Sequence, residues 1–424
     1  MEDIEEILNK ANRCLNCKNP ICKDGCPIST NIPEFIKCIK EENFLQAYTI
    51  LQNNNIMSDI CSNICPVEEQ CMGKCIRGIK EKPVDINQLE KFINEWAEKN
   101  NIEDKINVNK DNNKKIAIIG AGPAGIACAV ELRKKGYEVI IFEKENKIGG
   151  LLEYGIPDFR LAKSKVERIE KIIKEIGIKI KTNIEFGKDL NIEDLKIAGY
   201  DAIFLGIGAG IASLYSLNLD DCNNIYKSDD ILKKYYNHEK LDSCKSLAVI
   251  GGGNVALDCA RTAKKMGVKK VTVVYRRTKD LMPAIKSEVD EAINEGIEFI
   301  FNTKVIKGYV DKENKLEKIE CIKTKIESNQ VIDIEKSNFE ILADGVVFAI
   351  GLKIDKKLIE QNHIEIENGL IKIDENNMTN IPGVFAGGDL TQKKATVCRA
   401  IASGKKTAIG IDNYLQLFTK KNKR

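Results

Sequence analysis

The sequence predicts an α/β protein in which two nested, doubly wound parallel-sheet domains follow a small α-helical domain. From Lys115 onward, apolar β-branched runs alternate with amphipathic stretches, a pattern typical of doubly wound sheets. The order strand, glycine turn, helix, strand occurs twice, in IAIIGAGPAGIACAVELRKKGYEVIIFEK and in SLAVIGGGNVALDCARTAKKMGVKKVTVVYRR. Before Lys115 the chain is rich in cysteine and has helical patterns, but it has no run typical of a buried parallel strand.

A second internal similarity predicts how the domains are nested. The segment DAIFLGIGA near Tyr200 resembles DGVVFAIGL near Ile350, and the two flank the second glycine unit. We therefore expect the second sheet domain to be inserted into the first. The expected parts are a helical domain (1–113), the first part of one nucleotide-binding domain (114–243), an inserted nucleotide-binding domain (244–343) and the second part of the first (344–424).

Composition narrows the class of protein. The chain has 66 Lys and Arg against 63 Asp and Glu, for a net charge of +3 without a basic stripe, so nucleic acid is not an expected partner. No stretch approaches the roughly 18 apolar residues of a membrane span, and the amino terminus lacks a secretory pattern. We expect a cytoplasmic protein. Nine of the 15 cysteines precede Ala97, which favours metal or redox chemistry over disulfides.

The first glycine unit predicts a dinucleotide site. Gly120 permits a tight turn, Gly122 lets the backbone approach a pyrophosphate, and Gly125 lets the helix pack on the strand, with Pro123 and Ala124 between them. Glu143 ends the next strand, where a carboxylate can bind ribose hydroxyls. The alternative is an ordinary strand-to-helix turn.

The second glycine unit predicts a nicotinamide nucleotide site. Its turn and helix start are formed by Gly251, Gly253, Asn254, Val255 and Ala256. Where a ribose-binding carboxylate would stand, the chain has Arg276 and Arg277, and paired guanidinium groups suit a 2′-phosphate. NADPH is therefore favoured over NADH, although the arginines could instead be solvated or form salt bridges.

A third segment, GVFAGGDLTQKKATVCRAIASGKKTA, fits the flavin end of an FAD-binding domain. Gly388 and Asp389 follow a short strand, and a helix is expected to begin near Thr396 and Val397. The acid can bind a hydroxyl of the cofactor, and the helix amino terminus can stabilise negative charge on a reduced flavin.

The amino-terminal cysteines have the spacing of iron–sulfur ligands. They form two runs, Cys14, Cys17, Cys22 and Cys26, then Cys65, Cys71 and Cys75, and a proline follows Cys26 and Cys65. Zinc is the main alternative, but zinc ribbons usually pair two C-x-x-C units and only Cys14 and Cys17 form one. Cys61 is close enough in sequence to be a spare ligand but fits neither run.

The ordered set of motifs resembles a known family. RCLNCKNPICKDGCP, ICSNICPVEEQCMGKC, GAGPAG, EKENKIGGLLEYGIPDFRL, GGGNVALDCARTAKKMG, YRR and GVFAGGDLTQKKATVCRAIASG are similar to the small (β) subunits of NADPH-dependent glutamate synthase. The same architecture occurs in the large subunit of NADH-dependent ferredoxin:NADP oxidoreductase and in the nicotinamide-oxidising half of dihydropyrimidine dehydrogenase.

The resemblance implies two [4Fe-4S] clusters and further site residues. It implies one cluster on Cys14, Cys17 and Cys22, and another on Cys26, Cys65, Cys71 and Cys75. One cluster then lacks a ligand, a place that Glu90 is expected to fill. The stretch 149–160 resembles the family's flavin-lining segment; further expected cofactor contacts are Lys144, Gly150, Leu151 and Arg160.

The resulting functional hypothesis is an electron-input subunit. NADPH would reduce FAD, and electrons would pass through the clusters to a larger catalytic subunit or a ferredoxin-like acceptor. No catalytic side chain is expected, because the reactive atoms belong to the cofactors. The acceptor could be of the glutamate synthase, dihydropyrimidine dehydrogenase or ferredoxin:NADP type. The rival class is a stand-alone flavin reductase with a structural metal module.

Overall fold

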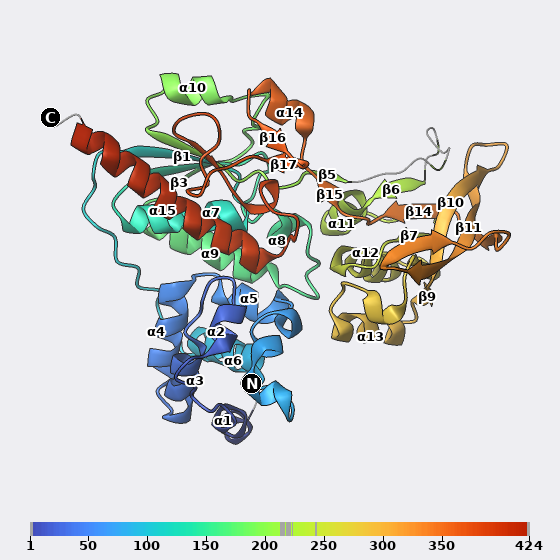
Figure 1. The fold of residues 1–424 in the computed structure, drawn as a ribbon, viewed down its shortest axis with the longest axis horizontal. Coiled ribbons are helices and arrows are strands. Elements are labelled where there is room, and N and C mark those ends of the chain that lie inside the picture. The colour runs from blue at the N-terminus through green and yellow to red at the C-terminus, as the bar shows by residue number, and fades with distance from the viewer. Residues whose placement is uncertain (1–2, 213–216, 218–221, 223, 242–243, 422–424) are drawn as a thin grey trace. The chain divides into compact units, whose positions relative to one another are not determined.

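The chain forms two compact units. The computed structural model describes residues 3–212, 217, 222, 224–241 and 244–421 (Figure 1). The first unit contains Met1–Glu153, Asp158–Ala209 and Ile354–Arg424, and the second contains Tyr154–Pro157 and Gly210–Lys353. Most of the second unit is thus an insertion in the first, and the predicted nested α/β architecture is confirmed.

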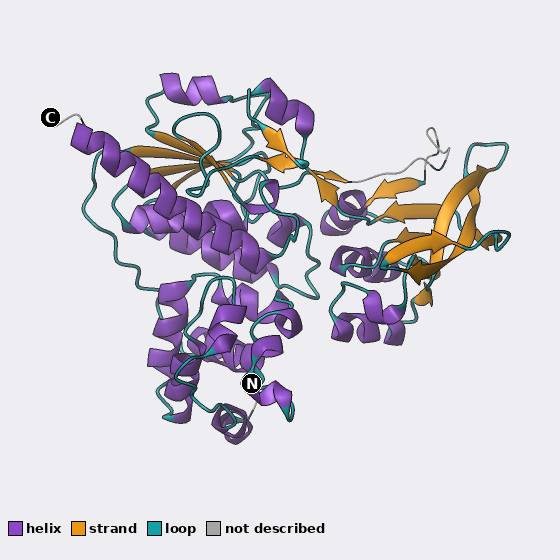
Figure 2. Cartoon of the chain, in the orientation of Figure 1, coloured by secondary structure: helices purple, strands orange, loops and turns teal. Residues whose placement is uncertain are grey.

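The amino-terminal part of the first unit is helical. Among the described residues before Lys115 there are helices, 3₁₀ turns and loops but no strand (Figure 2). The helices are α1 (Ile4–Asn12), α2 (Ile21–Gly25), α3 (Ile32–Lys40), α4 (Phe44–Asn54), α5 (Ser58–Ile64) and α6 (Ile86–Lys99). Three 3₁₀ turns, η1 (Val67–Glu69), η2 (Met72–Lys74) and η3 (Ile76–Ile79), follow α5.

The helical domain has its own core because its helices are amphipathic. On α3, Phe35, Ile36 and Ile39 recur at helical spacing and are fully buried. They pack in one cluster with Leu89 and Ile93 of α6. This core keeps the cysteine-bearing loops and turns at fixed positions around it.

The body of the first unit is a parallel five-stranded sheet in the order β18, β4, β1, β2, β3. These strands are β1 (Lys115–Ile119), β2 (Glu138–Phe142), β3 (Lys179–Lys181), β4 (Ala202–Leu205) and β18 (Val384–Ala386). Its helices are α7 (Pro123–Lys134), α8 (Leu151–Tyr154), α9 (Lys163–Glu175), α10 (Ile192–Ile197), α14 (Lys356–Gln361) and α15 (Val397–Lys421), with the turn η5 (Gly388–Leu390) and a small hairpin of β16 (Ile366–Glu367) and β17 (Leu370–Ile371).

The long helix α15 lies against α7 (Figure 1). The two helices approach closely because α15 has a glycine at the contact. A Cβ atom added to Gly404 would lie 2.1 Å from the backbone oxygen of Ala124. The carboxyl-terminal helix is thereby held over the start of α7, where the first glycine turn lies.

The second unit, like the first, is built around a parallel five-stranded sheet. Its parallel sheet has the order β6, β14, β7, β8, β9, with β6 (Ile225–Lys227), β7 (Ser246–Ile250), β8 (Lys270–Val274), β9 (Glu298–Ile300) and β14 (Gly345–Phe348). It also contains α11 (Ser228–Tyr236), α12 (Asn254–Lys265), η4 (Lys279–Leu281) and α13 (Lys286–Asn294). An antiparallel sheet contains β10 (Thr303–Val310), β11 (Leu316–Glu327), β12 (Gln330–Asp333) and β13 (Phe339–Leu342), and β5 (Ile211–Ala212) pairs with β15 (Leu352–Lys353).

The unit boundaries differ from the expected domain boundaries at 243/244 and 343/344. The second sheet already includes β6, which precedes residue 244, and residue 243 itself lies outside the described residues. At the other end, the segment DGVVFAIGL contains β14, which pairs with β7. Its resemblance to β4 reflects an equivalent place in the second sheet, so the first unit resumes at Ile354.

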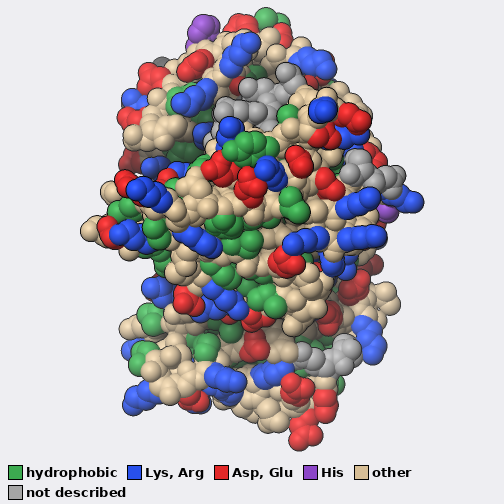
Figure 3. Space-filling model, turned by 90° about the vertical axis from the view of Figure 1, so that its right-hand side faces the viewer, with side chains coloured by type: hydrophobic (Ala, Val, Ile, Leu, Met, Phe, Trp, Pro, Cys, Tyr) green, Lys and Arg blue, Asp and Glu red, His purple; other side chains and the backbone are tan. Residues whose placement is uncertain are grey.

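The surface carries charges of both signs. On the face shown in Figure 3, Lys and Arg side chains are interspersed with Asp and Glu, in line with the net charge of +3. Among the described residues, every helix is too short or too polar to span a lipid bilayer.

Gly404→Ala should destabilise the first unit by about 1–3 kcal/mol, the cost of an overpacked contact. The added methyl group would meet backbone, which cannot rotate away, and this outweighs alanine's helix preference of about 1 kcal/mol. Denaturant unfolding followed by circular dichroism measures the change. Ile409→Ala on the same helix, where the side chain is 57% exposed, is the matched control. Equal or higher stability of Gly404→Ala would contradict the close contact.

Candidate functional sites

The first glycine turn connects β1 to α7 and has the geometry expected for phosphate binding. Gly120 has φ +97°, and a Cβ there would lie 2.6 Å from the backbone oxygen of Gly206. A Cβ on Gly125 would lie 2.0 Å from the oxygen of Gly120, so this glycine lets the helix approach the turn. In contrast, a Cβ on Gly122 would have no described atom within 4 Å. Space is therefore open in front of the α7 amino terminus, which begins with Pro123 and Ala124.

Glu143 is fixed beside this turn. Its carboxylate accepts hydrogen bonds from the backbone N–H of Ala121, at 2.7 Å, and of Glu145, at 3.0 Å. The side chain is buried, whereas the neighbouring Lys144 is exposed. The carboxylate is thus oriented by backbone donors at the end of β2, where an acidic group can bind a ribose.

The segment from Gly149 to Arg160 approaches the same turn. The N–H of Gly149 donates to the oxygen of Ala121 at 2.8 Å. Gly150 has φ +55°, and a Cβ there would lie 3.1 Å from Cα of Gly122. Leu151 is exposed at the start of α8 and Arg160 is half-buried. The structure thus brings Gly150 to the glycine turn, as a cofactor-lining segment requires.

The segment at Gly388 reaches the turn from the carboxyl-terminal side. Gly388 has φ +67°, its Cβ would lie 3.0 Å from Cβ of Ala124, and its N–H donates to Ser403 Oγ at 2.9 Å. Thr396 and Val397 are half-buried, directly at the start of α15. The structure brings both predicted flavin segments to the α7 amino terminus.

Unpartnered polar atoms at this segment fit a polar cofactor. Asp389 Oδ1, Gln392 Nε2 and Arg399 Nε are buried and have no hydrogen-bond partner among the described residues. Burial raises the pKa of Asp389 above its usual value. Buried polar atoms normally have partners, so the residues present suit a ligand such as FAD, with its ribityl and pyrophosphate oxygens.

The second unit contains the nicotinamide-type turn between β7 and α12. Gly251 has φ +151°, and its Cβ would lie 2.3 Å from the oxygen of Ala349. The space at Gly253 is open, as at Gly122. Asn254 Oδ1 accepts from the N–H of Ile285 at 2.9 Å, Val255 is exposed and Ala256 is fully buried. The turn between β7 and α12 therefore has the same arrangement of glycines as the turn between β1 and α7.

Arg276 and Arg277 follow β8 with free guanidinium groups. Their backbone oxygens are bonded, to Thr324 Oγ1 at 2.9 Å and to the N–H of Asn302 at 3.0 Å. Across the part of the chain that the structure describes, neither side chain has an ion pair or hydrogen bond. The salt-bridge alternative for these arginines is therefore not supported by the described contacts, and the pair can bind a phosphate.

One group of thiols lines a cavity in the helical domain. Cys14, Cys17, Cys22 and Cys75 all face it. The segment after Cys75 is held against the first cysteine run, because Arg77 Nε donates to the backbone oxygen of Arg13 at 2.6 Å. Burial, together with the neighbouring Cys75, raises the pKa of Cys22 to about 11.

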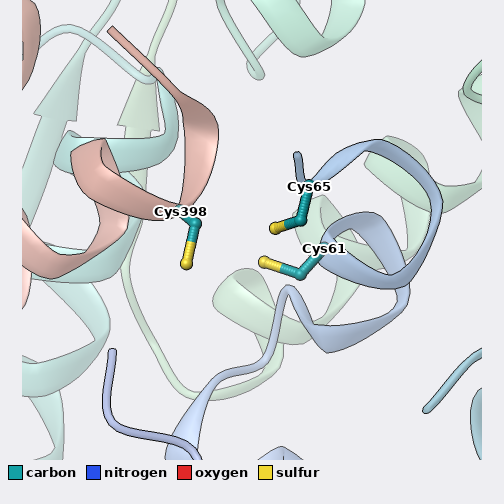
Figure 4. Close-up of side chains that lie close together, drawn as sticks. All are labelled: Cys61, Cys65 and Cys398. Carbon is teal, nitrogen blue, oxygen red and sulfur yellow. The ribbon is translucent and has the colours of Figure 1, made fainter. Parts of the chain in front are cut away.

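A second group of donors lies around α5 and α6. Cys26, Cys71 and Glu90 interact electrostatically with one another, and burial raises the pKa of Glu90 to about 8. Ser58 Oγ donates to the Glu90 carboxylate at 2.7 Å. Cys65 belongs to the same neighbourhood through Cys61 and Cys398, whose sulfur atoms lie within 4.8 Å of each other and of its own (Figure 4).

This grouping differs from the division that the resemblance implied. Cys75 lies with Cys14, Cys17 and Cys22, and Glu90 lies with Cys26 and Cys71. The resemblance implied that Cys65, Cys71 and Cys75 bind one cluster together. The turn η2 lies between Cys71 and Cys75, and the two cysteines belong to different groups.

Cys61 and Cys398 are two site residues that were not predicted as ligands. Cys61 lies on α5 and Cys65 caps the end of this helix four residues later, and their sulfurs lie within 4.8 Å of each other. Cys398 directly follows Thr396 and Val397, which were predicted to contact the flavin. This adjacency is the one feature of the sequence that could have indicated a role for Cys398 at a cofactor. Its proximity to Cys65, which lies more than 300 residues earlier, results from the tertiary fold and could not be predicted from local sequence.

Comparisons with known proteins agree with this arrangement. Residues 114–404 match the pyridine nucleotide-disulphide oxidoreductase family, and residues 2–102 match the 4Fe-4S cluster domain described as dihydropyrimidine dehydrogenase domain II. The chain belongs to the pyridine nucleotide-disulphide oxidoreductase family, as a member with an added iron–sulfur domain. It is, more particularly, an NAD(P)H-oxidising flavin and iron–sulfur electron-transfer protein related to the small chain of NADPH glutamate synthase.

The relatives share most of their length with this chain. The glutamate synthase [NADPH] small chain of Escherichia coli is 33% identical over 96% of this chain and 91% of its own. That of Azospirillum brasilense is 33% identical over 97% and 89%. The NAD-dependent dihydropyrimidine dehydrogenase subunit PreT of Escherichia coli O157:H7 is 31% identical over 96% and 94%.

Solved structures share the fold of the nucleotide-binding parts. The Mycobacterium tuberculosis oxidoreductase FprA covers 73% of this chain and 86% of its own with a TM-score of 0.60 at 18% identity. The thioredoxin reductase of T. acidophilum covers 72% and 100% with a TM-score of 0.53 at 20% identity. At these identities the likeness shows the fold alone.

Gly122→Ala should fold normally and bind FAD at least about tenfold more weakly, a loss of about 1.4 kcal/mol. The added methyl group meets no described protein atom and would occupy the space where a pyrophosphate approaches the backbone. Fluorescence titration of apoprotein with FAD measures the affinity, and circular dichroism checks the fold.

Gly125→Ala is the contrasting variant, because its methyl group would meet the Gly120 oxygen at 2.0 Å. It should disturb the turn itself and lower the stability of the apoprotein. Unchanged FAD affinity of Gly122→Ala would show that no pyrophosphate lies at this turn.

Proposed function

We propose that this chain is an electron-input subunit that oxidises NADPH with one FAD and passes electrons through two [4Fe-4S] clusters to a partner subunit. The observation that carries the proposal is the presence of two separate groups of buried or half-buried thiols in the same compact unit as the FAD-type turn. A simple flavin reductase has no use for two such groups. The matching iron–sulfur domain over residues 2–102 supports the same conclusion.

The flavin site would use backbone more than side chains. The open space at Gly122 and the amino terminus of α7 would receive the pyrophosphate, and Glu143 would bind the adenosine ribose with its backbone-fixed carboxylate. Asp389 would take a cofactor hydroxyl as the partner of its unpaired Oδ1. The first N–H groups of α15, after Thr396, would stabilise negative charge at the flavin ring.

The second unit would select the reductant. Its turn at Gly253 would hold the pyrophosphate of the nicotinamide nucleotide, and Arg276 and Arg277 would bind the 2′-phosphate that distinguishes NADPH from NADH. Both guanidinium groups lack partners in the described chain, so they could bind this phosphate without first breaking a salt bridge.

The thiol groups would hold the clusters. Cys14, Cys17, Cys22 and Cys75 would bind the first. Cys26, Cys65 and Cys71 would give three thiolates to the second, with Glu90 as a candidate for the fourth position. When bound, the flavin accepts hydride as an electron pair and the clusters accept single electrons. The protein's part is to hold these groups in order and to exclude water.

The electron acceptor would be another chain, of glutamate synthase type, which makes glutamate from 2-oxoglutarate and glutamine. Support comes from relatives that cover nearly the whole chain and carry the name of that enzyme's small chain. The relative named as a dihydropyrimidine dehydrogenase subunit keeps that acceptor as the alternative. Anaerobic co-purification from the native cell identifies the partner.

The anaerobically purified chain should contain about eight irons and eight sulfides with one FAD, and NADPH should bleach its visible absorbance.

Variants of two residues that bind the same cluster should lose the same EPR signal. Cys17→Ala and Cys75→Ala should each remove the same EPR signal of the reduced protein, whereas Cys71→Ala should remove the other. Cys259→Ala, in the second unit, is the control. One zinc and no iron would refute the electron-transfer function.

Arg276→Ala and Arg277→Ala should each lower kcat/KM for NADPH by about 10- to 100-fold, because each removes a charge-assisted hydrogen bond worth about 1.5–3 kcal/mol. Reduction by NADH should change little. Rapid mixing of the oxidised protein with each nucleotide measures both rates. Lys312→Ala removes an exposed positive charge of the same unit as a control. An equal loss with NADH would argue against a 2′-phosphate site.

A further inference from the structure

Cys398 places a thiol of the flavin-binding part among the cluster thiols of the helical domain. It is the second residue of α15 and is 2% exposed. Its sulfur lies within 4.8 Å of those of Cys61 and Cys65, and the three side chains point toward one another from α15 and α5 (Figure 4). Cys26 is near enough to interact electrostatically with Cys398. Three thiols thus meet at one place in the first unit, with a fourth nearby.

Polar contacts on both sides of Cys398 hold α15 against the helical domain. Before it, Lys394 forms an ion pair with Glu69. After it, Lys405 Nζ donates to Asn54 Oδ1 at 3.2 Å, and it also donates to the backbone oxygen of Asn54. These contacts hold the backbone that carries Cys398 against the helical domain.

The other two candidate donors, Glu90 and Cys61, each accept a hydrogen bond from a residue of the helical domain. The Glu90 carboxylate accepts from Ser58 Oγ at 2.7 Å, and Asn94 donates to that hydroxyl at 3.1 Å. The sulfur of Cys61 accepts from Asn55 Nδ2 at 3.4 Å. Iron–sulfur clusters are held mainly by thiolates, and among the described thiols of this group Cys398 is the one contributed by the flavin-binding part.

We propose that Cys398 is the fourth ligand of the second cluster, together with Cys26, Cys65 and Cys71, in the position expected for Glu90. This inference rests on the proposed function, since it requires that the second cluster exists. Binding would replace the S–H bond of Cys398 with an Fe–S bond and release the proton to solvent. Glu90 and Cys61 would then remain beside the cluster as non-ligating neighbours.

The position of Cys398 gives this ligand a second role. Thr396 and Val397, the two residues before it, are the proposed contacts of the flavin ring. A ligand at Cys398 would therefore connect the cluster iron to the flavin-binding segment through the backbone of adjacent residues. The same bond would fasten α15 to the helical domain.

The test compares Cys398→Ala with Glu90→Ala in the full chain, purified anaerobically. Cys398→Ala should keep FAD but lose about four irons, or show the oxidised-state EPR signal of a three-iron cluster. Glu90→Ala should keep about eight irons and the wild-type spectrum of the reduced protein. Cys128→Ala, which removes a buried thiol of α7, is the control and should resemble wild type.

Two results would overturn the inference. One is a Cys398→Ala protein with unchanged iron content and EPR spectrum. The other is loss of the cluster in Glu90→Ala while Cys398→Ala keeps it. Should Cys398→Ala lose FAD as well, Cys398→Ser provides the test, since an oxygen ligand must shift the g values and midpoint potential. Wild-type protein without iron would refute the proposed function instead.

Discussion

The close approach of α15 to α7 is the contact on which the first unit depends. It exists because Gly404 has no side chain where it meets the Ala124 backbone oxygen. Through it, the last helix of the chain reaches the first glycine turn, and Gly388 and Asp389 are placed at the α7 amino terminus. The same approach carries Cys398 to the thiols of α5. One backbone contact thus positions parts of both cofactor sites.

In the second group of thiols, the surroundings of Cys26 and Cys71 disfavour the charged thiolate form. The interaction with Cys398 and burial raise the pKa of Cys26, and burial raises that of Cys71. Without metal these thiols therefore stay protonated near neutral pH, and several thiolates at one buried place would repel one another. Iron supplies the positive charge that such a set requires, which couples cluster binding to proton release.

Local sequence patterns predicted much of this molecule, and tertiary contacts decided the rest. The two glycine turns were predictable because strand, turn and helix are adjacent in sequence, and the turn geometry requires glycine at Gly120 and Gly251. The division of the thiols was not, since Cys71 and Cys75 are only four residues apart yet belong to different groups. The end of the inserted unit was missed because β14 resembles β4 in sequence but pairs with β7.

The split of the first unit has a consequence for biogenesis. Its edge strand β18 and helix α15 are translated after the whole inserted unit. While the ribosome is still making the inserted unit, the nascent helical domain can already expose Cys14, Cys17, Cys22 and Cys75 to an iron donor. The neighbourhood of Cys65 stays incomplete until Cys398 emerges. If Cys398 is a ligand as proposed, the cluster that uses it could be completed only after α15 has emerged from the ribosome.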